Sequence, residues 1–185
     1  MHRLLKAPLL IIGLFVLPGT ADAKLTGAQG ENSAKFNASG PAGLAIVGTT
    51  TGVTVSDDGS TVSVAVPLAT LDTGISLRNR HMREKYLDVA KFPFAVLAVP
   101  RGAINFPTAG AEVKSTAPAT ITLHGVSQPV TIQYSARNDG GTYRVVGTAP
   151  LNINSFGIQV PSYLGITVKP DVTVEVHFAV TDSGT

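Results

Sequence analysis

Near the C-terminus, apolar residues recur at every second position, and this pattern limits the possible folds more than any other part of the sequence. Between positions 172 and 181 every second residue is apolar, namely Val172, Val174, Val176, Phe178 and Val180. Successive side chains of a β-strand point to opposite faces, so the pattern predicts a long strand with one apolar and one wetter face.

Similar patterns recur along most of the chain. They predict strands over Ser33–Ser39, Leu44–Val55, Val62–Leu68, Pro93–Val99, Thr120–His124, Val130–Arg137 and Tyr143–Asn154. Turn signals separate them at Gly40-Pro41, Asp57-Asp58-Gly59, Gly125-Val126 and Asp139-Gly140-Gly141. The count is about eight strands, the number at which a closed barrel fills itself or encloses one small ligand. The expected fold class is therefore all-β.

One segment departs from the strand pattern. Residues Leu77–Val89 carry helix formers and clustered charge, and Pro93 follows closely. Leu77, Met82 and Tyr86 fall on one apolar stripe of a helix. We predict a short helix between strands, which caps one mouth of the barrel.

The N-terminus has the organisation of a secretory signal peptide. Arg3 and Lys6 precede the apolar run Leu9–Leu17, and Ala21-Asp22-Ala23 supplies small residues for cleavage. The run is shorter than the roughly 20 residues that span a bilayer, so a membrane anchor is the weaker interpretation. We expect a signal peptide over 1–23, a single domain over 24–185 that does not span the membrane, and a periplasmic or secreted location.

Charge and cysteine content exclude several classes of protein. Loss of residues 1–23 would remove two of 14 basic and one of 12 acidic residues, leaving a nearly neutral chain. Such a balance over the whole chain argues against nucleic acid as a partner and against polybasic docking on a membrane. The chain has no cysteine, which excludes thiol chemistry, cysteine-bound metal and a lipid anchor on cysteine.

The alternation leaves the interior of the barrel undecided. Inward positions hold mostly Val, with no Trp available to fill the centre, so either an apolar cavity or a packed sandwich is compatible with the pattern. An outer-membrane barrel would need aromatic girdles, which four Tyr and no Trp supply poorly.

Four segments in order resemble the YceI family of exported lipid-binding barrels. They are KFNASGPAGLAIVG (35–48), TGISLRNRHMREKYLDVAKFP (73–93), LHGVSQPVTI (123–132) and FGIQVPSYLGITV (156–168). The resemblance implies an antiparallel eight-stranded lipocalin-like barrel that holds a polyisoprenoid or similar amphiphile, with no catalysis.

On this basis we expect a bound isoprenoid or quinone-like lipid and neither a metal nor another cofactor. Arg78, Arg80 and Arg83 form a basic cluster with Lys85 on the predicted helix. We expect one of these arginines, Arg78 among them, and His81 to meet a polar head group at the mouth. The residues expected to form the cavity and its mouth are Phe36, Leu44, Ile46, Val64, Val66, Arg78, His81, Met82, Tyr86, Phe92, Phe94, Ile132, Phe156, Tyr163, Leu164, Val174 and Phe178.

Two other functions remain open from the sequence. His81, Glu84 and Asp88 share a face of the predicted helix, which would suit a metal-assisted hydrolase built on His81 and Glu84. A non-catalytic interaction module of the cell envelope would instead have a filled core and an exposed apolar patch. An unpaired strand edge would also permit a homodimer.

Overall fold

A computed structural model describes residues 24–27, 30, 32–163 and 166–182. Its helical pieces are the α-helix α1 (Ser76–His81), a π-helical turn over Met82–Tyr86, and short 3-10 turns over Pro41–Gly43, Arg101–Ala103 and Ile153–Phe156. The strands are β1 (Leu25–Gly27), β2 (Ser33–Ser39), β3 (Ala45–Thr51), β4 (Thr54–Asp57), β5 (Thr61–Pro67), β6 (Phe94–Pro100), β7 (Glu112–Leu123), β8 (Val126–Asp139), β9 (Thr142–Asn152), β10 (Ser162–Tyr163), β11 (Ile166–Thr167) and β12 (Asp171–Asp182).

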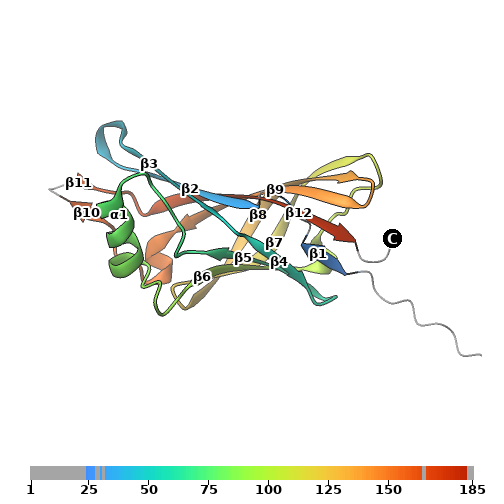
Figure 1. The fold of residues 1–185 in the computed structure, drawn as a ribbon, viewed down its shortest axis with the longest axis horizontal. Coiled ribbons are helices and arrows are strands. Elements are labelled where there is room, and N and C mark those ends of the chain that lie inside the picture. The colour runs from blue at the N-terminus through green and yellow to red at the C-terminus, as the bar shows by residue number, and fades with distance from the viewer. Residues whose placement is uncertain (1–23, 28–29, 31, 164–165, 183–185) are drawn as a thin grey trace, which may run out of the picture.

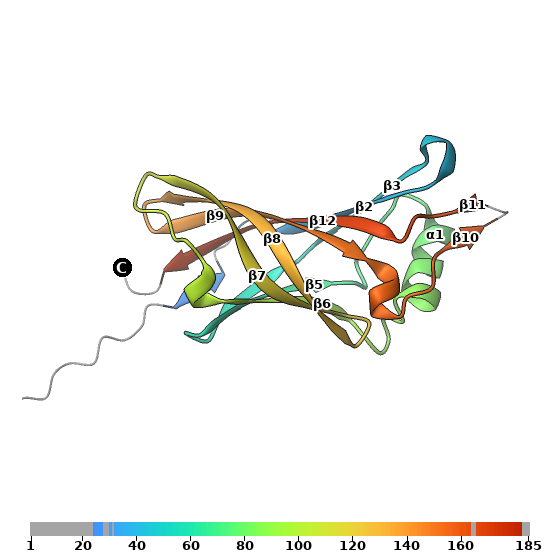
Figure 2. The ribbon, with the colours of Figure 1, turned by 180° about the vertical axis from the view of Figure 1, so that it is seen from behind.

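Ten strands of the described chain form one antiparallel sheet, which curls strongly (Figures 1 and 2). Its order is β3-β2-β12-β9-β8-β7-β6-β5-β4, and β1 adds to β12. Strands β10 and β11 form a separate hairpin that lies with α1 at one end of the sheet.

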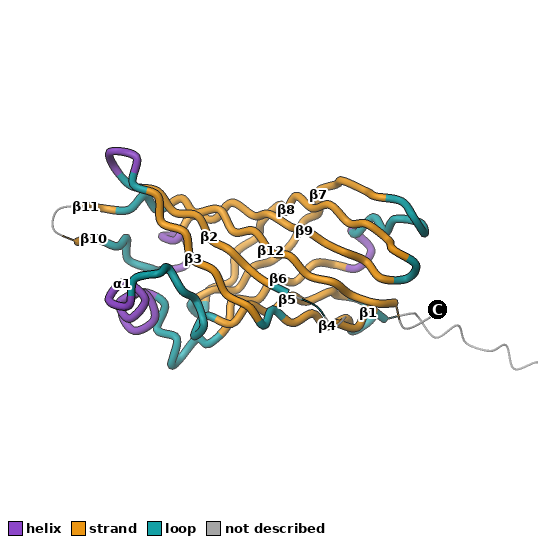
Figure 3. Tube along the Cα trace, turned by 45° about the horizontal axis from the view of Figure 1, so that its top comes forward, coloured by secondary structure: helices purple, strands orange, loops and turns teal. Residues whose placement is uncertain are grey.

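The sheet closes through one bent stretch of chain. Strands β3 and β4 stand at opposite ends of the strand order, yet only Gly52 and Val53 separate them in sequence. Gly52 has a φ of 80°, a conformation that residues with a Cβ rarely adopt. The chain bends there and changes its partner from β2 to β5, which wraps the sheet into a barrel (Figure 3).

The structure confirms the antiparallel barrel and refines the strand count. The predicted strand over Leu44–Val55 is divided by the bend into β3 and β4. With these two taken as one bent strand and the three-residue β1 set aside, eight long strands make up the barrel. The bend escaped prediction because Gly in a strand pattern signals a bulge without revealing a change of partner.

The predicted helix is shorter and less regular than expected. Six α-helical residues form α1, and the next five form a π-helical turn. Such wide turns are rare and occur often at functional sites. Among the described residues, no helix has the length and apolar character to cross a membrane.

The end of the barrel opposite α1 is filled by its own side chains. Leu25, Val62 and Val180 are buried together there, with Phe178 and Tyr143 packed against them. A second cluster, around Val53 and Val64, lies further along the interior. Inward residues of the same type therefore pack against one another at one end, and the free volume is at the other.

Candidate functional site

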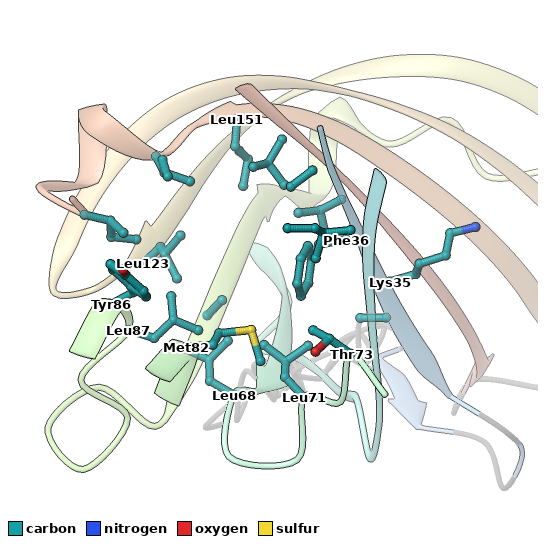
Figure 4. A pocket seen from close by; sticks show the side chains of 18 of the residues that line it. Lys35, Phe36, Leu68, Leu71, Thr73, Met82, Tyr86, Leu87, Leu123 and Leu151 are labelled. Carbon is teal, nitrogen blue, oxygen red and sulfur yellow. The ribbon is translucent and has the colours of Figure 1, made fainter. Parts of the chain in front are cut away.

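A cavity of about 500 Å³ lies inside the barrel beneath α1 (Figure 4). The strands supply its walls through inward positions that alternate in sequence, as Phe36 and Ala38 do on β2. Strand residues of this kind are Ala34, Phe36, Ala38, Ile46, Val64, Val66, Ala95, Leu97, Ile121, Leu123, Ile132, Ala149, Leu151, Val172, Val174 and Val176. Turns and loops add the apolar side chains of Leu44, Leu68, Leu71, Ile153 and Ile158.

Polar side chains are few and gather near the covering segment, which consists of α1 and the π-helical turn after it. Thr73, Arg78, His81 and Ser162 lie at this end of the cavity, and Thr148 on β9 also borders it. Lys35 borders it too, but its side chain extends away from the cavity in Figure 4, and its Nζ pairs with Glu175 Oε1 at 3.0 Å. The site can therefore bury a long apolar group and meet most of its polar side chains at its mouth.

Hydrogen bonds fix α1 to the loop that precedes it. Asn79 Nδ2 donates to Asp72 Oδ1 at 2.6 Å, and Asn79 Oδ1 accepts from the backbone N–H of Thr73 at 2.8 Å. Arg78 donates to Thr73 Oγ1 at 2.7 Å and to the Thr73 carbonyl at 2.6 Å. The loop is in turn joined to β3, because Asp72 and Thr49 exchange two backbone hydrogen bonds.

The charge of Asp72 is stabilised by these contacts. The pKa of its carboxyl lies below the ordinary value because the Gly74 N–H and then the Asn79 amide donate to the carboxylate. The carboxylate is exposed, so this is a local effect on the loop rather than a large contribution to stability.

The structure brings most of the predicted site residues to one cavity. Those that line it are Phe36, Leu44, Ile46, Val64, Val66, Arg78, His81, Met82, Tyr86, Ile132 and Val174. They come from five strands, the turn before β3 and the covering segment, so the cavity gathers residues from most of the length of the domain. Leu164 lies outside the described residues, as does the side chain of Tyr163.

Four predicted residues lie elsewhere. Phe92 packs edge-on against His124 at the β7–β8 turn, with ring centroids 4.9 Å apart. Phe94 is outward on β6 and 51% exposed. Phe156 is 2% exposed and belongs to the packed core, while Phe178 fills the opposite end of the barrel. Neither the strand pattern nor the family resemblance reveals how far along the barrel an aromatic residue lies, or whether it packs in the core instead of lining the cavity.

Several residues that line the cavity were not among those predicted from the sequence. Ile121 and Leu123 on β7 belong to the alternating pattern, so their inward position could have been inferred from it. Ile153 and Ile158 come from a 3-10 turn and the loop after it, where no periodic signal exists.

The residues considered for a metal site are separated by the shape of the covering segment. His81 lines the cavity, whereas Glu84 is exposed on the π-helical turn and Asp88 has a φ of 44° beyond it. The regular helix ends at His81, so the predicted common face is absent. Within the described ranges, no group of three or more His, Asp or Glu side chains is arranged to hold a metal ion.

Comparison with known proteins gives a consistent family assignment. The family described as YceI-like domain matches residues 22–180. A UPF0312 protein of Pseudomonas syringae pv. tomato is 34% identical over 131 residues, which cover 64% of this chain and 62% of that protein. A UPF0312 protein of Pseudomonas fluorescens is 32% identical over 129 residues, 63% of this chain and 62% of that protein. The chain thus spans less than two thirds of the length of these curated relatives.

Two solved structures share the fold. A polyisoprenoid binding domain from Saccharophagus degradans, implicated in plant cell wall breakdown, superposes with a TM-score of 0.69 at 16% identity and covers 87% of this chain and 98% of that domain. Burkholderia cenocepacia BcnA gives a TM-score of 0.60 at 18% identity, over 80% of this chain and 96% of that protein. At such identities the likeness concerns the fold alone.

Proposed function

The chain belongs to the YceI-like domain family, and on that premise we propose that it binds a long-chain amphiphile of polyisoprenoid type inside its barrel without catalysing a reaction. The apolar tail lies in the cavity, and the polar head lies at the mouth near Arg78 and His81. The proposal covers the described domain, since the curated relatives are longer than the matched region.

The observation on which the proposal depends is that the cavity is lined almost entirely by apolar side chains. Its volume of about 500 Å³ falls in the range of small-molecule sites, roughly 300–1,000 Å³. Its walls are almost wholly apolar, so water inside gains few hydrogen bonds, whereas a hydrocarbon gains about 25 cal/mol for each Å² removed from water. A solved domain of the same fold is a polyisoprenoid binding domain, which supports this class of ligand.

The arrangement of polar groups supports a defined orientation. A tail that entered head first would bury its polar atoms against apolar side chains such as Leu97, Ile121 and Ile132, which offer them no hydrogen bond. With the tail inward, the head reaches the end of the cavity that holds Arg78, His81 and Ser162. Arg78 is already ordered by its bonds to Thr73, which reduces the entropy lost on contact with a head group.

The proposal also includes export to the periplasm or the cell exterior. Residues 1–23 lie outside the described residues, so its support is the signal-peptide pattern of the sequence.

Extraction of the purified protein with organic solvent, followed by mass spectrometry, tests the proposal. We expect a long-chain isoprenoid in a near-stoichiometric amount, or its uptake when a polyprenol or a quinone with a long side chain is added. Protein that is empty after purification and that also fails to bind both added probes would rule the proposal out.

A further inference from the structure

The mouth of the cavity exposes large apolar side chains to solvent. Ile75 and Leu77, at the start of α1, are 52% and 43% exposed, and Ile166 on β11 is 49% exposed. All three also line the cavity, so its apolar wall continues out onto the surface. Among the described residues, these are three of six exposed large hydrophobic side chains. Figures 1 and 2 place α1 and the β10–β11 hairpin at the same end of the barrel.

Basic residues outnumber acidic ones along the covering segment, which forms one side of this apolar rim. Residues 76–91 contain five Arg or Lys and two Asp or Glu. Arg80, Lys85 and Lys91 are exposed, and none of them forms an ion pair with a carboxylate in the described part of the chain.

The opposite end of the barrel has a different charge pattern. There Arg137 and Arg144 both bind Asp139, at 2.7 and 3.1 Å, and Lys114 lies 3.8 Å from Glu112. The cations of that end are balanced by nearby carboxylates. At the rim, Lys85 and Lys91 lie over the rings of Tyr86 and Phe92, contacts that leave their positive charge unneutralised.

We propose that this rim, formed by Ile75, Leu77 and Ile166 and bordered by the covering segment with its exposed Arg80 and Lys85, docks on the surface of an anionic lipid bilayer. Apolar side chains bordered by basic residues bind the interface of such membranes through burial and electrostatic attraction. The inference rests on the proposed function, because docking places the cavity mouth against the acyl chains and lets a ligand pass without crossing water.

The continuity of the apolar surface favours a bilayer over a protein partner. A protein docked over Ile75, Leu77 and Ile166 would close the mouth and leave the cavity without access at this end. A second copy of this chain would bring the cations of residues 76–91 against the same cations, an unfavourable pairing. A fluid, negatively charged bilayer surface attracts the basic residues of the covering segment and leaves the mouth of the cavity open to lipid.

The test is flotation of the chain from Lys24 onward with two kinds of vesicle, phosphatidylcholine alone and a 3:1 mixture with phosphatidylglycerol. We expect binding to the anionic vesicles and weaker binding to the neutral ones. Arg80→Gln with Lys85→Gln should lower binding to the anionic vesicles by about fivefold for each charge removed. Neither residue lines the cavity, so the ligand content found by extraction should stay unchanged.

A second variant removes the apolar contribution. Ile75→Ser with Leu77→Ser should reduce vesicle binding by about tenfold or more. Lys114→Gln, at the opposite end, and Phe106→Ser, an exposed aromatic outside the cavity, serve as matched controls that retain binding. Circular dichroism verifies that each variant folds.

The outcomes separate the docking surface from the cavity. Absence of vesicle binding, or equal binding by the rim variants and the wild type, overturns docking even if the protein yields a lipid on extraction. A rim variant that changes oligomeric state instead of vesicle binding assigns the rim to self-association and also overturns it. Charge-dependent vesicle binding by a protein that takes up no lipid upholds docking and refutes the cavity function.

Discussion

Gly48 lies directly against the ring of Phe36, its partner across the β2–β3 ladder. A Cβ at position 48 would stand 2.1 Å from Phe36 Cε1 and 2.5 Å from its Cζ, closer than atoms can approach. Because Gly48 on β3 has no side chain, there is room beside it for the ring of Phe36, the aromatic residue that β2 contributes to the cavity wall. This pair shapes the cavity, since Phe36 would otherwise have to turn into it.

Replacing Gly48 by Ala should force the Phe36 ring toward the cavity and destabilise the fold by about 1–3 kcal/mol, the usual cost of overpacking. Urea unfolding measures the change. The cost should nearly vanish in a Phe36→Ala background, because the clash is then absent. Gly147→Ala is the matched control: its Cβ would lie 3.4 Å from Val176 Cγ2, an ordinary contact. Equal costs for the two glycines would contradict this account.

Filling the cavity should abolish ligand binding while the barrel survives. Ala149 is a buried wall residue on β9, and the Phe side chain of Ala149→Phe would project into free volume rather than into packed atoms. We expect ligand content on extraction to fall at least about tenfold, with a stability change below about 3 kcal/mol. Ala117→Phe, at a 1% exposed core position that does not line the cavity, should instead destabilise the protein severely.

Loss of the Asn79 side chain should loosen the covering segment. Its amide joins α1 to both Asp72 and Thr73, so Asn79→Ala should cost about 1–2 kcal/mol and speed the release of a bound lipid. Ligand exchange can be followed with a fluorescent polyprenol. Arg80→Ala, on the next residue and exposed, is the control. Unchanged exchange in Asn79→Ala would show that this segment does not limit release.

Low pH should weaken the hydrogen bonds that join α1 to the loop containing Asp72. The pKa of Asp72 is lowered in the folded protein, so its stabilising contacts are present above the ordinary value of 3.8 and are lost as the pH falls through the lower, folded value. In Asn79→Ala one donor is missing, the pKa moves back toward 3.8, and the loosening should begin at a higher pH. NMR titration of the Asp72 carboxyl measures both values. Identical titration curves would contradict the assigned role of Asn79.

Export predicts a defined N-terminus. Edman sequencing or mass spectrometry of the protein recovered from the periplasm or medium of an expressing Gram-negative cell should give Lys24 as the first residue. Substituting Ala21 and Ala23 by Leu should block processing and leave a longer, membrane-associated form. Recovery of the intact chain in the soluble cytoplasm would refute export.

Much of the fold could be predicted from local patterns. The alternation at positions 172–180 corresponds to β12, and Asp139-Gly140-Gly141 to the turn between β8 and β9. Successive side chains of a strand point to opposite faces, so a short stretch of sequence shows both that a strand forms and which of its residues share a face. For this reason the alternation alone was enough to assign Val64, Ile132 and Val174 to the interior, where they line the cavity.

Local sequence patterns were enough to establish the β-class of the chain, its strands and turns, and which side chains point inward, because each of these depends on neighbours within a few residues. How far along the barrel each inward residue lies depends instead on the folded structure as a whole. Val180 and Val172 belong to one alternating row of β12, yet Val180 is buried in the filled end and Val172 lines the cavity. Depth along the barrel depends on register and closure between distant segments, including the bend at Gly52, and no local pattern carries that information.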